Sequence, residues 1–148
     1  MDADLLTLAR LARLLERACG ELEPPLTLAQ YRLVAMIASG SDRASHLAGL
    51  LALAKPTVSA TVDTLVERGL VERSTSRDDR RVTTLTVTAV GREVLGRAEA
   101  AMRDRLDDVL AHVDDPTAVA QSIAALGTAL DERRAARRAA SGAAKAGA

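Results

Sequence analysis

The apolar residues of this chain follow a helical period except over residues 71–87, where the pattern becomes that of β-strands. Val71, Arg73 and Thr75 alternate with Glu72 and Ser74, which is the two-residue period of a strand. Residues 82–87 are rich in β-branched side chains and have no helical stripe. Between these two runs lies a charged segment, residues 76–81, which suits the tip of a hairpin. A single β-hairpin set among helices limits the chain to a few mainly α architectures.

The remaining apolar residues recur at spacings of three and four and predict six helices. Thr27 and Thr88 are good N-caps for two of these helices, and Gly69 is a natural stop for another. Pro56 suits the first position of its helix, where its missing N–H costs nothing. The expected helices cover residues 3–22, 28–39, 44–51, 56–68, 89–113 and 116–138.

The order helix–helix–helix–hairpin over residues 26–91 is that of a winged helix-turn-helix lobe. We therefore expect a mainly α fold with a small β-hairpin wing and a helical dimerisation region. Residues 1–25 and 92–139 would supply the dimerisation helices, because they carry more apolar surface than the small lobe can cover. Residues 140–148 contain no large apolar side chain and predict a disordered tail.

Composition narrows the class of protein further. The formal net charge is zero, so any contact with nucleic acid must depend on where charges lie rather than on their sum. Cys19 is the only cysteine and cannot form an internal disulfide. No apolar run reaches the roughly 18 residues of a membrane span, and the acidic start, residues 1–4, lacks the basic segment of a signal peptide. These features predict a cytoplasmic protein with no membrane partner.

The predicted helix over residues 56–68 has a short and mostly neutral outward face. Val58, Val62 and Leu65 fall on the opposite, inward side. A helix that enters the major groove needs small outward residues, because base edges must be approached closely. An ordinary amphipathic helix is the alternative reading of this segment alone. The candidate DNA-binding residues here are Lys55, Pro56, Thr57, Ser59, Ala60, Thr61 and Thr64.

The hairpin tip carries three further candidates, Arg77, Arg80 and Arg81, within five residues. An arginine inserted into the minor groove gains from the negative potential there. Asp79 lies close enough in sequence to orient the Arg81 guanidinium through a salt bridge. The alternative is a solvated turn with self-compensating charge. Residues 42–92 hold eight basic and six acidic side chains, a net charge of only +2, which predicts modest non-specific affinity for DNA.

Several motifs resemble those of the MarR family of regulators. They are Leu26-Thr27-Leu28-Ala29-Gln30-Tyr31, residues 47–53 followed by Lys55-Pro56-Thr57-Val58-Ser59, residues 65–73, and Asp79-Arg80-Arg81 followed by Val87-Thr88 and Gly91. Ala54 departs from the family, which commonly has a Ser or Asp cap at this position. The resemblance implies a homodimer that binds double-stranded DNA with two recognition helices and with wing arginines, Arg81 foremost, and so a repressor of transcription.

The sequence leaves other roles open. A winged-helix module that binds proteins and not DNA would show the same helix order. Members of the family often respond to a small-molecule effector such as an aromatic acid or phenol, some respond to oxidants through a cysteine, and a few bind zinc. Here an oxidant sensor would use Cys19, and a zinc site would use Asp108 and His112 with Glu21, Glu23 and Cys19. The sequence contains no phosphate loop, no nucleophile–base arrangement and no dense metal cluster. We therefore expect neither an enzyme nor a bound cofactor or metal.

Overall fold

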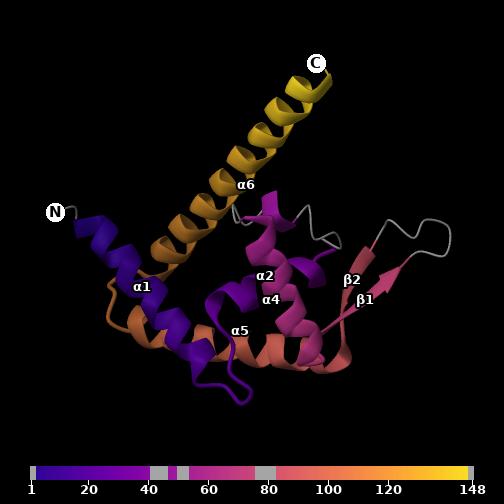
Figure 1. Cartoon of the computed structure of the whole chain (residues 1–148). Coiled ribbons are helices and arrows are strands. Elements are labelled where there is room, and N and C mark those ends of the chain that lie inside the picture. The colour runs from indigo at the N-terminus through magenta and orange to yellow at the C-terminus, as the bar shows by residue number, and fades with distance from the viewer. Residues whose placement is uncertain (1–2, 41–46, 50–53, 76–82, 147–148) are drawn as a thin grey trace. The chain divides into compact units, whose positions relative to one another are not determined.

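The computed structural model describes residues 3–40, 47–49, 54–75 and 83–146 (Figure 1). The chain divides into two compact units, Met1–Asp107 and Asp108–Ala148. The mainly α fold with one small hairpin is confirmed. Its elements are α1 (Ala3–Gly20), α2 (Leu28–Ala38), α4 (Lys55–Glu67), β1 (Val71–Thr75), β2 (Thr83–Val87), α5 (Ala89–Leu110) and α6 (Pro116–Ala146).

Several of the expected bounds differ from those of the structure, and one expected helix is seen only in part; α5, for example, ends at Leu110 and not at residue 113. The prediction of a disordered tail over residues 140–148 is wrong as far as Ala146, where α6 ends. The reason is that alanine, which dominates this segment, has the highest helix propensity. Of the helix expected over residues 44–51, residues 47–49 are helical and the others lie outside the described residues. α1 ends at Gly20, two residues earlier than predicted.

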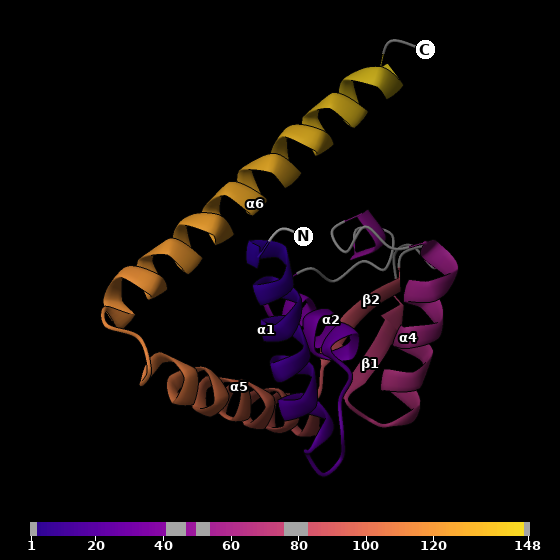
Figure 2. The same ribbon diagram turned by 90° about the vertical axis from the view of Figure 1, so that its left-hand side faces the viewer.

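The core of the first unit is built from aliphatic side chains of α1, α2, α4, both strands and α5. α4 packs against both α2 and β1, while α2 also packs against β2 and α1 (Figures 1 and 2). Leu33, Leu47, Leu65 and Leu70 are its largest fully buried side chains. No polar side chain of the described residues is buried, so the position of α4 depends on apolar packing.

The hairpin is antiparallel, with Val71 opposite Val87 and Arg73 opposite Leu85. Val71, Leu85 and Val87 are buried and therefore mark the face of the hairpin that packs on the core. Arg73 lies on this same face at the point where the strands leave the core, because opposite residues share a face.

A tight joint connects the end of α4, the start of the hairpin and the start of α5. The Thr88 hydroxyl donates to the Gly69 carbonyl oxygen (2.7 Å) and accepts from the Gly91 amide (2.9 Å), which confirms Thr88 as the cap of α5. Gly69 has φ of 68°, a left-handed conformation that glycine adopts without strain. Gly91 lies directly against Leu70, so that a Cβ at Gly91 would collide with the Leu70 carbonyl oxygen. The hairpin is thereby fixed to the body of the unit at its base.

We predict that Gly91→Ala lowers the free energy of unfolding by about 1–3 kcal/mol, because the added methyl group has no room against rigid backbone. The matched control is Gly96→Ala in the same helix, where a Cβ meets nothing within 4 Å. This control should stabilise the protein by about 0.5–1 kcal/mol, since alanine is the better helix former. Urea denaturation of both variants measures the difference, and equal shifts would contradict the packing described for Gly91.

Candidate nucleic-acid interface

The inward face of α4 is fully buried, and this burial determines which residues of the helix point outward. Val58, Val62 and Leu65 are each 0% exposed. All seven candidate residues of this segment are described, and the structure keeps them on the surface. Thr61 is half-buried, and the exposed residues are Lys55, Pro56, Thr57, Ser59, Ala60 and Thr64. The candidates on the hairpin tip, Arg77, Arg80 and Arg81 with Asp79, lie outside the described residues.

Two threonines of this face donate their hydroxyl protons to backbone carbonyl groups of α4 itself. Thr61 Oγ1 donates to the Thr57 carbonyl oxygen (2.9 Å), and Thr64 Oγ1 donates to the Ala60 carbonyl oxygen (3.1 Å). A hydroxyl bonded in this way keeps lone pairs that can accept a further hydrogen bond. These two residues therefore offer methyl groups and acceptors, rather than donors, to a molecule that approaches the helix.

The start of α4 has no side-chain cap. Ala54 is the N-cap with an extended backbone, and its methyl side chain makes no capping hydrogen bond. Lys55 rather than Pro56 is the first helical residue, so the predicted start was one position late. The first amide groups of a helix have no partner within it. Near Lys55, they suit an anionic acceptor such as a DNA phosphate.

On one side of α4, an open hollow of about 250 Å³ separates this helix from the start of α2. On the α2 side, the hollow is lined by the capping box of this helix. In this box, Gln30 N donates to Thr27 Oγ1 (3.1 Å) and Thr27 N donates to Gln30 Oε1 (3.0 Å). Sequence reasoning used Thr27 only as a cap and did not assign Gln30 to the interface. The hollow is lined by Thr27, Ala29, Gln30, Thr57, Ala60, Thr61 and Thr64.

On its other side, α4 is tied to the hairpin by an ion pair that sequence analysis did not predict. Arg73 Nη2 lies 2.6 Å from Asp63 Oδ1, and both side chains are partly exposed. The pair neutralises an acidic group on the exposed side of α4. Ser74 and Thr84 also share a hydrogen bond (2.8 Å) across the outer face of the hairpin. The described part of the wing is thus held in a defined direction relative to α4.

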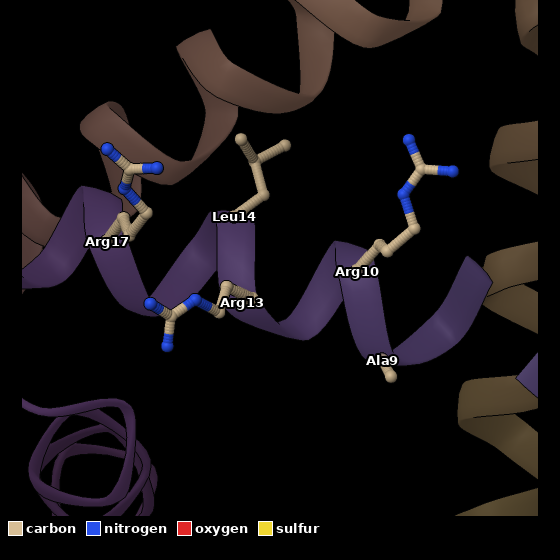
Figure 3. A pocket seen from close by; sticks show the side chains of 5 residues that line it. All are labelled: Ala9, Arg10, Arg13, Leu14 and Arg17. Atoms are coloured by element: carbon tan, nitrogen blue, oxygen red, sulfur yellow. The ribbon is translucent and has the colours of Figure 1, made fainter. Parts of the chain in front are cut away.

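A second hollow, of about 390 Å³, lies along α1 and is lined by Ala9, Arg10, Arg13, Leu14 and Arg17. Figure 3 shows that Arg10, Leu14 and Arg17 point to the same side of the helix, whereas Arg13 points to another. No carboxylate of the described residues forms an ion pair with these three arginines. This surface of α1 is therefore positively charged.

The structure offers little support for oxidant sensing through Cys19 or for a zinc site. Cys19 is completely buried, and burial together with the nearby Glu16 carboxylate raises the pKa of its thiol. A raised pKa disfavours the reactive thiolate. His112 Nδ1 lies 2.9 Å from the Asp108 backbone carbonyl oxygen, and Glu21 pairs with Arg105. Within the described ranges, no group of three His, Cys, Asp or Glu side chains is arranged to hold a metal ion, and no helix is long and apolar enough to span a bilayer.

Comparison with known proteins agrees with this geometry. Residues 25–82 match a family model described as MarR family. A search of curated protein sequences found no match. The chain resembles the transcriptional regulator BldR from Sulfolobus solfataricus, with 25% identity over 86% of this chain and 92% of that chain and a TM-score of 0.67.

Two solved structures of the repressor CouR are also similar. The chain is 26% identical to CouR bound to a 23-mer DNA duplex, over 85% of this chain and 88% of that one, with a TM-score of 0.72. It is 23% identical to CouR from Rhodococcus jostii RHA1 bound to p-coumaroyl-CoA, over 87% and 92% of the two chains, with a TM-score of 0.68. Residues 25–82 thus match the MarR family model, and the chain as a whole shares the winged-helix fold of transcriptional regulators such as BldR and CouR.

Proposed function

We propose that the protein is a sequence-specific DNA-binding regulator, acting in the cytoplasm as a ligand-responsive repressor. The observation that carries this proposal is the outward face of α4, which is small, mostly neutral and exposed between the hollow beside α2 and the Arg73–Asp63 pair. Such a helix can approach base edges in the major groove. The DNA-bound structure of CouR supports the same use of this fold. Nothing in this reading requires a catalytic step.

We further propose that the operator is bound by a homodimer. The described helices outside the lobe expose large apolar side chains, which a monomer would leave in contact with water. Leu5 is 65% exposed on α1, and Leu126 is 59% and Leu130 50% exposed on α6. A second copy of the chain can cover these stripes by two-fold symmetry. The operator would then be a pseudo-palindrome with half-sites about 34 Å apart, one turn of B-form DNA.

The proposed response to a ligand rests on the hollow along α1. Arg10 and Arg17, which point to the same side of α1, favour an anionic compound, and Leu14 between them adds apolar surface (Figure 3). Pockets that combine apolar lining with a few polar groups are typical of small-molecule sites. CouR, which has a similar fold, is seen bound to p-coumaroyl-CoA, and this supports the proposal that a protein of this fold can take a small ligand.

Ala60→Glu directly tests the outward face of α4, which is the proposed reading face of this helix. We expect at least tenfold weaker binding to an operator selected from random duplexes, because the longer carboxylate prevents close approach and repels phosphate. Fluorescence anisotropy with labelled duplex measures this change. Ala125→Glu, at an exposed position of α6, makes the same substitution away from this face and should bind as the wild type does. Equal losses of DNA affinity in both variants would contradict the assignment of α4 to the DNA interface.

Arg81→Ala separates the DNA-binding proposal from that of a protein-binding module. If Arg81 enters the minor groove, the variant should bind duplex DNA about tenfold or more weakly while its oligomeric state is unchanged. Electrophoretic mobility shift and light scattering measure the two properties. Unchanged DNA binding would favour the protein-binding alternative.

Leu126→Glu tests the dimer. Since Leu126 is largely exposed, the substitution should leave the fold of the protomer intact, yet a buried carboxylate would disfavour association. We expect the dissociation constant of the dimer to rise at least tenfold in sedimentation experiments. Ala125→Glu, its neighbour off the apolar stripe, should have a much smaller effect. A dimer that is equally strong in both variants would contradict the assignment of α6 to the interface.

A further inference from the structure

The carboxamide of Gln30 is held in one orientation by two hydrogen-bond donors. The Thr27 amide donates to Gln30 Oε1 (3.0 Å), and Arg68 Nη1, from the end of α4, donates to the same oxygen (3.3 Å). Arg68 is itself fixed, because its Nη2 donates to the Pro25 carbonyl oxygen (2.6 Å). The Gln30 side chain therefore connects the start of α2 to the far end of the reading helix.

This arrangement determines where the amide nitrogen of Gln30 lies. Both partners are donors, so the atom between them must be the oxygen, and the NH₂ group takes the other position. Among the residues that the structure describes, no group accepts a hydrogen bond from Gln30 Nε2. The side chain is half-buried and lines the hollow beside Thr57, Thr61 and Thr64. Two N–H donors are thus presented at the edge of the α4 reading face without a partner.

In the described part of the chain, no hydrogen bond joins these donors to the neighbouring threonines of the hollow. Thr61 and Thr64 donate their own hydroxyl protons within α4, and their remaining lone pairs stay available to an approaching donor. If α4 lies in the major groove, a residue on the adjacent α2 stands beside the groove and not at its floor. The acceptor at that place is a phosphate oxygen of the bordering DNA strand.

We propose that Gln30 is a DNA-contacting residue that donates from Nε2 to this phosphate, and that Arg68 is the positioning residue that orients it. This proposal rests on the proposed DNA-binding function. Arg68 acts through Gln30, because its Nη1 and Nη2 already donate to Gln30 and Pro25. A contact of this kind sets the position of the protein on the duplex and carries no sequence preference of its own.

Gln30→Glu distinguishes this role from a purely structural one. Glutamate keeps the capping box and strengthens the contact with Arg68, so the thermal stability should be unchanged or higher. It replaces the two outward donors by a charged acceptor. We therefore expect at least tenfold weaker binding to every duplex tested, measured by anisotropy at fixed salt. Binding equal to that of the wild type would overturn the proposal, because a capping role alone predicts that result.

Gln30→Ala separates a lost contact from added charge. This neutral variant should bind about threefold to tenfold more weakly, as expected for one or two lost hydrogen bonds. Gln121→Glu on α6 controls for the change in net charge and should bind as the wild type does. If only Gln30→Glu were weak and Gln30→Ala were normal, the residue would be near DNA without donating to it, and the proposal would be wrong.

The DNA partner and the role of Arg68 are tested in the same assay. A neutral methylphosphonate at the contacted phosphate should abolish the difference between wild type and Gln30→Ala, whereas a loss confined to one base pair would contradict a phosphate contact. Arg68→Met should weaken binding about threefold or more, yet add nothing to Gln30→Ala, and additive losses would overturn its positioning role. Should the wild type bind no duplex, the DNA-binding function fails too. Normal wild-type binding with unaffected Gln30 variants rejects this inference alone.

Discussion

The burial of three side chains of α4 is the constraint on which the interface depends. Val58, Val62 and Leu65 are completely removed from water, and each such burial contributes roughly 1.5–3 kcal/mol. A rotation of the helix by one residue would expose all three, at a cost of about 5–9 kcal/mol, comparable with the whole stability of a small domain. The outward direction of Thr57 and Ala60 is therefore a consequence of the core.

Polar contacts on both sides of α4 refine this position without adding much stability. The Arg73–Asp63 pair is partly exposed, and pairs of that kind contribute roughly 0–1 kcal/mol. The contacts of Arg68 with Gln30 and Pro25 are directional in the same way. Apolar packing sets the rotation of the helix but is non-directional. The polar contacts are what relate the reading helix to the hairpin on one side and to the start of α2 on the other.

The sequence was sufficient to predict those features that depend on neighbours along the chain. The helical period gave the inward face of α4, and the alternation over residues 71–75 gave the first strand. It could not reveal the hollow, because Gln30 and Thr57 meet only after α2 and α4 have packed. Arg68 was part of a recognised motif, but its partners are 38 and 43 residues away in the chain. The tail was mispredicted because an absence of apolar residues does not oppose helix formation by alanine.

The zero net charge of the chain becomes consistent with a DNA-binding role once the surface of α4 is considered in detail. Affinity from phosphate neutralisation alone scales with the number of cations at the interface, and α4 contributes Lys55 as its only lysine or arginine. Of its two acidic residues, Asp63 is compensated by Arg73. In the proposed complex, α4 itself gains little from charge, so its share of the binding energy must come from close fit and hydrogen bonds. Weak non-specific binding then raises the ratio of specific to non-specific affinity, which is the quantity that decides occupancy of an operator among many competing sites.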